Sequence, residues 1–248
     1  LEAPRGIVYD SASFEFLVMD TGNDRLQRFD QNGVFLEETG VTGVGDGQFT
    51  DPEDLAIDVR GNVFVADTLN HRVQRFGVAG AAPPFVRTWG TSGSDPGEFD
   101  LLGQLGTDAE GNVYSTDSGN DRIEKFAADG GLLLTIPGVT DVRGVAVGDD
   151  GTIYAVTPTG VSRYGPTGTA LGSWPAPDPL AIAISPVTGD VALASDTTDT
   201  VEIYSPTGTF VRRFGDTGPN CGGNVSAIGG VAVADDGRVY VSDRGGDC

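Results

Sequence analysis

Basic residues, histidine and cysteine are all scarce in this sequence of 248 residues. The chain carries 15 Lys and Arg against 36 Asp and Glu, which gives a formal net charge of −21, and Lys125 is its single lysine. Because nucleic-acid binding depends on clustered Lys and Arg, this balance disfavours a nucleic-acid partner. We expect most acidic residues to serve in turns and on a solubilising surface, and an acidic patch for cations or basic partners is the less favoured alternative.

The remaining absences remove several kinds of site. His71 is the only histidine, so a zinc site built from three histidines is excluded. No Gly-rich phosphate loop follows a strand and opens a helix, which leaves a nucleotide site unsupported. No apolar run approaches the ~18 residues of a membrane span, so we expect no membrane insertion within this segment. The chain begins at Leu1 without an initiator Met, and we therefore expect it to be a mature or trimmed segment.

A repeated strand, turn and strand is what the sequence does contain. The clearest copy is VFVADTLNHRVQRF at 63–76, and two others, at 16–29 and 113–126, keep Asp, Asn, Arg and a final Phe at the same spacing. Weaker copies lie at 153–164, 191–204 and from Val239 onward. Alternating apolar residues interrupted by a short polar turn predict two antiparallel strands in each copy.

The spacing of the copies predicts the architecture. They recur about every 38 to 50 residues, which is the length of a propeller blade. A short apolar strand and a Gly turn precede each copy, and a further turn and strand follow it, so the unit has four antiparallel strands. We predict one all-β domain, a six-bladed β-propeller of four-stranded antiparallel blades whose sixth blade is incomplete in this chain. The predicted blades cover approximately 5–40, 52–89, 101–136, 142–174, 179–214 and, in part, 228–248.

The repeated motif resembles the NHL repeat. The resemblance rests on GNVFVADTLNHRVQRF, on the preceding GVGDGQFTDPEDLAID (43–58) and on its echo around 97–99, and it weakens after the third copy. It implies a six-bladed propeller in which the Asp, Asn and Arg of the motif are scaffold residues. The single histidine excludes the three-His zinc site of the peptidylglycine amidating lyase, a catalytic relative, and the chain lacks the basic face of the RNA-binding branch.

The last copy stops early. After the strand that starts at Val239 the sequence supplies only a few residues, so two outer strands of the sixth blade are missing from it. The favoured interpretation is a segment trimmed from a longer protein. The alternative is an open strand edge of blade six that another chain completes, by a protein partner or by self-assembly.

Both cysteines fall near this incomplete blade. Cys221 lies in the loop that enters it and Cys248 lies just after its second strand, and in a four-stranded blade these two positions face the same side. We predict a disulfide between them and hence an oxidising compartment, with two free thiols in a cytosolic protein as the alternative. Asn224 begins a glycosylation triplet in the same loop.

The channel mouth is the remaining candidate site. The residues that start the inner strands include Arg5, Glu53, Asp54, Gln104 and Arg143. Their oxygens would suit calcium, as in lactonase-like propellers of the gluconolactonase type, but Gly and Ala dilute the ring and two arginines oppose a cation. We therefore assign no catalytic residue, metal or cofactor, with calcium as the open alternative.

The favoured function follows from the scarcity of catalytic, metal-binding and nucleotide-binding motifs. We predict an extracellular or cell-surface recognition or assembly module that binds a protein or other surface ligand without catalysis. The alternative is a calcium-dependent hydrolase or lactonase-like enzyme that uses the central channel.

Overall fold

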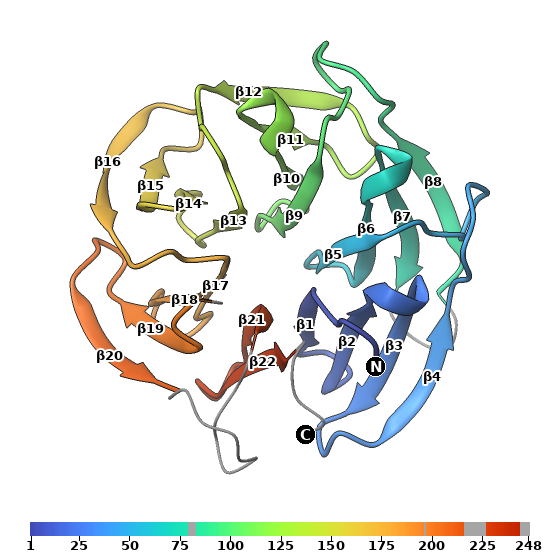
Figure 1. Ribbon diagram of the computed structural model, residues 1–248, viewed down its shortest axis with the longest axis horizontal. Coiled ribbons are helices and arrows are strands. Elements are labelled where there is room, and N and C mark those ends of the chain that lie inside the picture. The colour runs from blue at the N-terminus through green and yellow to red at the C-terminus, as the bar shows by residue number, and fades with distance from the viewer. Residues whose placement is uncertain (79–82, 196, 216–226, 244–248) are drawn as a thin grey trace.

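The protein is an all-β propeller. The computed structural model describes residues 1–78, 83–195, 197–215 and 227–243. In this part of the chain, five four-stranded antiparallel sheets and one two-stranded sheet are arranged around a central axis (Figure 1). Each sheet takes its strands in chain order, from the axis to the periphery.

The first three sheets contain the best-preserved copies of the motif. Their strands are β1 (Ile7–Asp10), β2 (Glu15–Asp20), β3 (Arg25–Asp30) and β4 (Phe35–Thr39); β5 (Pro52–Ile57), β6 (Asn62–Asp67), β7 (Arg72–Val78) and β8 (Phe85–Trp89); and β9 (Leu102–Thr107), β10 (Val113–Asp117), β11 (Arg122–Phe126) and β12 (Leu132–Pro137). A 3₁₀ turn joins the second and third strands of each: η1 (Thr21–Asn23), η2 (Thr68–Asn70) and η3 (Ser118–Asn120).

The later sheets lack this turn in the described residues. Their strands are β13 (Gly144–Val147), β14 (Ile153–Thr157), β15 (Gly160–Tyr164) and β16 (Ala170–Pro175); β17 (Ala181–Ile184), β18 (Val191–Ser195), β19 (Thr200–Tyr204) and β20 (Phe210–Phe214); and the pair β21 (Ile228–Val233) and β22 (Val239–Asp243). Five blades are thus complete, and residues 228–243 form a two-stranded sheet.

The clearest sequence copy shows how the motif folds. β6 and β7 pair antiparallel, with Val63 opposite Phe76 and Asp67 opposite Arg72. The turn between them closes on His71, whose φ of 51° lies in the left-handed region. The 3₁₀ turn η2 and this left-handed residue together reverse the chain, so the strand after the turn returns directly beside the strand before it.

The core lies between neighbouring sheets. Leu17 and Met19 of the first sheet pack with Val63 and Val65 of the second, and all four side chains are buried. Comparable apolar clusters lie between each later pair of sheets up to the pair β21–β22. A blade therefore buries its faces only against its neighbours, which favours a closed ring.

The ring closes between the two-stranded sheet and the first blade. β21 contacts both β17 and β1, so it occupies the next position around the axis (Figure 1). Tyr240 of β22 packs on Phe16, with ring centroids 4.4 Å apart, and Phe16 lies 5.1 Å from Tyr9. The Ser242 hydroxyl donates to the Arg5 carbonyl. These contacts hold β21 and β22 against the chain's first strands.

Candidate functional site

The polar side chains that recur in the repeat form a structural network. Asp67 is fully buried, and its Oδ2 accepts from Arg72 Nε at 2.7 Å and from Gln74 Nε2 at 2.9 Å. Asn70 donates to both carboxylate oxygens, and the Thr50 backbone N–H donates to Oδ1 at 2.8 Å. Because these donors occupy both oxygens, the Asp67 carboxylate has a structural role: it holds the turn, the following strand and the preceding linker together.

The same arrangement recurs in the first and third blades, and we call it the Asp–Asn–Arg network in all three. Asp20 and Asp117 are also fully buried, and each accepts from the Asn three residues on and the Arg five residues on. Each also accepts a backbone N–H from the segment that leads into its own blade, at Glu2 and Asp100. The structural role that the repeat resemblance implied for these residues agrees with these contacts.

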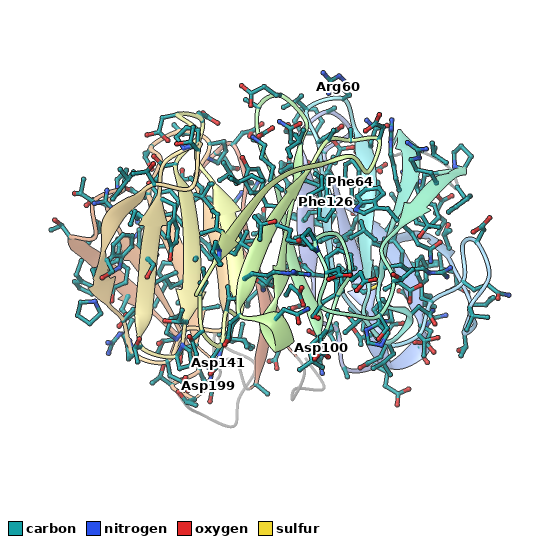
Figure 2. All side chains as sticks on the ribbon, turned by 90° about the horizontal axis from the view of Figure 1, so that it is seen from above. Arg60, Phe64, Asp100, Phe126, Asp141 and Asp199 are labelled. Atoms are coloured by element: carbon teal, nitrogen blue, oxygen red, sulfur yellow. The ribbon has the colours of Figure 1, made fainter. Side chains whose placement is uncertain are left out.

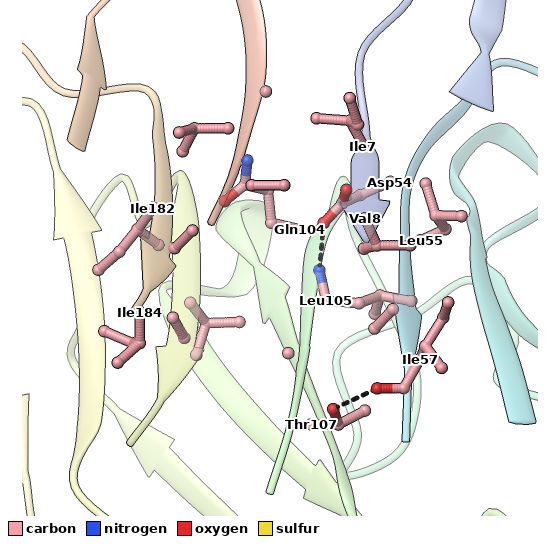
Figure 3. A pocket seen from close by; sticks show the side chains of 18 of the residues that line it. Ile7, Val8, Asp54, Leu55, Ile57, Gln104, Leu105, Thr107, Ile182 and Ile184 are labelled. Atoms are coloured by element: carbon pink, nitrogen blue, oxygen red, sulfur yellow. Dashed lines mark hydrogen bonds between the residues drawn. The ribbon is translucent and has the colours of Figure 1, made fainter. Parts of the chain in front are cut away.

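Two polar candidate residues, Asp54 and Gln104, lie in the wall of the central channel. Its cavity has a volume of about 240 Å³ and is lined by all six inner strands, from Ile7 of β1 to Val233 of β21. Figure 3 shows apolar side chains such as Ile182 and Leu55 around it, with Asp54 and Gln104 at one level of the wall. Two of the five candidate residues therefore lie together in the channel.

Asp54 is a buried carboxyl in this wall. Its Oδ2 accepts from the Leu105 backbone N–H at 2.8 Å, which links β5 to β9 (Figure 3). Burial raises the pKa of the Asp54 carboxyl to about 7, with backbone hydrogen bonds opposing that shift and the nearby Glu53 charge adding to it. A carboxyl with this pKa changes its charge near neutral pH, which makes it the most chemically distinctive group described.

The other three candidates pair with charged partners. Arg5 pairs with Glu53, and Arg143 Nη1 lies 2.7 Å from Asp178 Oδ1 and its Nη2 lies 3.8 Å from Asp141. All of these pairs are partly exposed. The sequence placed both arginines at the mouth but not Asp178, the partner of Arg143, which lies in a Pro-rich linker without any motif that marks it.

The opposite end of the channel uses its acids in turns. A larger cavity there, of about 580 Å³, is lined in part by Asp10, Asp58 and Asp108. Each accepts the backbone N–H two residues on, as in Asp58 Oδ1 with the Arg60 N–H at 2.9 Å. Across residues 1–78, 83–195, 197–215 and 227–243, no three His, Cys, Asp or Glu side chains gather closely enough to hold a metal ion.

Charged side chains lie at both ends of the propeller. Figure 2 shows Asp100, Asp141 and Asp199 at the end where the inner strands begin, and Arg60 at the other. Asp100 and Asp141 lie in the linkers that lead to β9 and β13, and Asp199 lies in the turn between β18 and β19. Acidic side chains thus lie at both ends of the channel, since Asp10, Asp58 and Asp108 line the cavity at the other end.

Two predicted features, the disulfide and the glycosylation site, cannot be placed in the described part of the chain. Cys221, Cys248 and Asn224 lie outside the described residues, so the disulfide and the glycosylation site stay predictions. No helix in the described part of the chain has the length and apolarity needed to cross a membrane.

Known proteins resemble this chain in two ways: by sequence over one repeat, and by fold over nearly the whole chain. The family profile described as NHL repeat matches residues 49–76. The B-box type zinc finger protein ncl-1 of Caenorhabditis elegans is 42% identical over 50 residues, and the protein brain tumor of Drosophila melanogaster is 40% identical over 50 residues. Each match covers 20% of this chain and only 6% and 5% of those relatives, respectively.

Solved structures share the whole architecture at low identity. A streptogramin B lyase superposes with a TM-score of 0.70 at 13% identity, over 98% of this chain and 91% of the lyase. Virginiamycin B lyase from Staphylococcus aureus gives 0.70 at 11% identity, over 97% of this chain and 78% of the lyase. A catalytically inactive histidine-to-alanine variant of that enzyme, solved with quinupristin, gives 0.67 at 12% identity over 97% of this chain and 77% of the other. At this identity the likeness shows the fold alone.

Proposed function

We propose that this NHL-repeat propeller is a non-catalytic recognition module, a single domain that binds a protein partner by strand pairing on β22. The observation that carries the proposal is the two-stranded sheet. In the described part of the chain β22 pairs with β21 alone, whereas the second strand of each of the other five sheets also pairs with a third. Exposed backbone donors and acceptors on a strand edge are a template for an incoming strand.

The position of this sheet supports a sixth blade. β21 follows β17 around the axis and precedes β1, and its register with β22 resembles that of the other inner pairs, with Val231 opposite Val241. Val239 and Val241 pack against the apolar cluster of the fifth blade. We infer that β21 and β22 are the inner half of a sixth blade and that the partner supplies its two outer strands as a hairpin.

The complete blades indicate what that hairpin should look like. Each third strand carries an apolar residue at its second position and an aromatic residue near its end. The apolar residues are Leu26, Val73, Ile123, Val161 and Val201, and the aromatic ones are Phe29, Phe76, Phe126, Tyr164 and Tyr204. We expect the partner strand to repeat this pattern, since it would face the same kind of neighbours.

The experiment uses a hairpin whose structure is known in this protein. A synthetic peptide with the sequence of residues 200–214, the outer half of the fifth blade, is added while amide hydrogen exchange is followed. We expect slower exchange at 239–242 and little change in the complete blades. A peptide with Val201→Pro, which removes a backbone donor, is the control and should give no protection. Absence of protection by the unmodified peptide at millimolar concentration would refute strand pairing at this edge.

A channel-based enzyme is the second candidate. Two observations favour it. Solved structures with the same fold include lyases, and the Asp54 carboxyl in the channel wall has a pKa raised to about 7. Against it, the inactive variant of the neighbouring lyase lost a histidine, and the single histidine here, His71, lies in the β6–β7 turn and not in the channel wall. Calcium-dependent thermal stabilisation together with lactone turnover would favour a hydrolase over the recognition module.

An extracellular or cell-surface location remains part of the proposal. It depends on the predicted pairing of Cys221 with Cys248. Titration of thiols in the unreduced protein tests it, because two reactive thiols per chain would remove the reason for an oxidising compartment.

A further inference from the structure

One level of the channel carries two polar side chains beside four small residues. The six inner strands contribute equivalent residues there. Two carry long polar side chains, and the other four are as small as residues can be: Asp54 and Gln104 on one side, then Gly6, Gly144, Ala181 and Gly230. Asp54 Oδ1 lies 2.4 Å from where a β-carbon of Gly6 would stand, so the small residues are what allow the two polar side chains to fit at this level.

The polar pair has hydrogen-bonding capacity to spare. A carboxylate offers about four acceptor positions, and backbone N–H groups, chiefly that of Leu105, use only part of those on Asp54. The Gln104 amide makes no side-chain hydrogen bond within the described residues, and its Oε1 lies beside Gly144, 2.5 Å from where a β-carbon would stand. Both residues line the cavity, and each keeps acceptor capacity that the described hydrogen bonds do not use.

The walls next to this level are apolar. Ile7, Leu55, Val145, Ile182 and Val231 belong to the adjoining positions of the inner strands and line the same cavity. The volume of about 240 Å³ lies below the range of about 300 to 1,000 Å³ usual for drug-sized ligands. The site would suit a molecule with a short hydrocarbon body and one polar head.

We propose that the central channel binds a small organic cation of the primary alkylammonium class, with its N–H groups on Asp54 and Gln104 and its hydrocarbon chain against the apolar wall. An ammonium group has three donors and no acceptor, which matches two acceptor side chains. Burying a cation is favourable only beside an opposite charge, which Asp54 supplies. The formal net charge of −21 adds a field that concentrates cations around the protein.

Other ligand classes fit less well. An anion would meet the Asp54 charge without a cation in the channel, because Arg5 is paired with Glu53 at the mouth. Calcium takes six to eight oxygen ligands, and this level offers one carboxyl and one amide. A neutral alcohol of the same length would keep the apolar contacts but lose the charge pairing, so it serves as the comparison ligand.

The test is a titration of the protein with n-butylammonium chloride, followed by calorimetry, beside n-butanol at the same concentrations. We expect saturable binding of the ammonium ion and at least tenfold weaker binding of the alcohol. Asp54→Asn keeps the size of the side chain and should weaken ammonium binding at least tenfold, whereas Glu110→Gln, on an exposed turn, should leave it unchanged. Circular dichroism of each variant reports that it is folded.

A pH series separates charge recognition from simple filling of a cavity. Because the pKa of Asp54 is about 7, the ionised fraction rises about tenfold between pH 6 and pH 8, and affinity for the ammonium ion should rise by about the same factor. The nearest charged groups, Glu53 and Arg5, pair with each other at the mouth. Non-saturable binding, equal affinity for butanol, or an Asp54→Asn variant that binds as tightly as the parent would each overturn the proposal, and none of these results bears on strand pairing at β22.

Discussion

Glu124 occupies a position at which the two other Asp–Asn–Arg networks have glutamine, and its replacement by glutamine should stabilise the protein. In the second blade, Gln74 donates to Asp67 at 2.9 Å and to the Gln48 carbonyl at 2.7 Å, while its own oxygen accepts from the Gly47 N–H. In the third blade, Glu124 keeps the acceptor role toward the Gly97 N–H, but its Oε2 is buried without a hydrogen-bond partner. The donor half of the network is therefore missing there.

The expected gain in stability from Glu124→Gln follows from the hydrogen-bond donor that Glu124 lacks. An unsatisfied buried polar group costs about 1 to 3 kcal/mol, and a restored hydrogen bond contributes about 1 kcal/mol. We expect Glu124→Gln to raise the free energy of unfolding by about 2 kcal/mol at neutral pH. For a domain of this size the midpoint of thermal unfolding should rise by about 4 to 8 °C.

The pH dependence identifies the cause. Burial raises the pKa of Glu124, and the neighbouring Asp117 charge adds to the shift, so the folded protein holds this proton at a pH at which the unfolded chain has released it. Stability contributed at Glu124 is thus present below its unfolded pKa of about 4.3 and is lost as pH rises through the raised folded value. The advantage of Glu124→Gln should grow above about pH 4.3 and then level off.

Urea unfolding at several pH values between about 4 and 9 measures this difference. Gln74→Glu is the reciprocal variant, and it should destabilise the protein with the same dependence on pH. Glu110→Gln, on an exposed turn, should have no measurable effect. A Glu124→Gln variant that is less stable than the parent, or whose advantage does not change with pH, would refute this account of the network.

Two further changes test the scaffold. Asp67→Asn removes the buried charge with which Arg72 pairs, and it should lower the free energy of unfolding by about 3 to 5 kcal/mol. Urea unfolding measures this loss, and a loss below about 1 kcal/mol would contradict the structural role of Asp67. Gly90→Ala should be strongly destabilising, by about 2 to 4 kcal/mol, because φ is +98° and a β-carbon would stand 2.4 Å from the Phe99 ring. Gly33→Ala, at a φ of +79° with open space around it, is the matched control and should cost about 1 kcal/mol; equal losses at the two glycines would show that contact with the ring is unimportant.

The repeating strands could be predicted because their pattern is local. The copy at 63–76 carries alternating apolar residues, a polar turn and a closing Phe, and these features became β6, η2 and β7. The left-handed residue in that turn was not predicted: it is Asp in two copies, Asp24 and Asp121, and His71 in the other, so no single side-chain type marks the position. Backbone closure there is imposed by the strands on either side.

The positions of the candidate residues at the start of the inner strands could be predicted, but their surroundings could not. Glu53 and Asp54 are neighbours of similar chemistry, yet one pairs with Arg5 near the mouth and the other is buried against Leu105. Side chains of adjacent strand residues point to opposite faces, so the outcome depended on a register that the sequence leaves open by one residue. The asymmetric ring of small residues needs all six inner strands in place before it can be seen.

The placement of the Asp–Asn–Arg networks has a consequence for how the protein opens. Each network binds the linker that enters its blade, so it joins two segments about 17 residues apart into one cooperative unit. Within the described residues, the fourth and fifth blades show no equivalent of Asp67: Ser195, at the end of β18, accepts from the Thr198 N–H at 3.4 Å and lies 3.3 Å from the Thr197 hydroxyl. Native-state hydrogen exchange should therefore find lower opening free energies at 153–164 and 191–195 than at 16–29, 63–76 and 113–126, so that among the five complete blades the ring loosens first at the fourth and fifth.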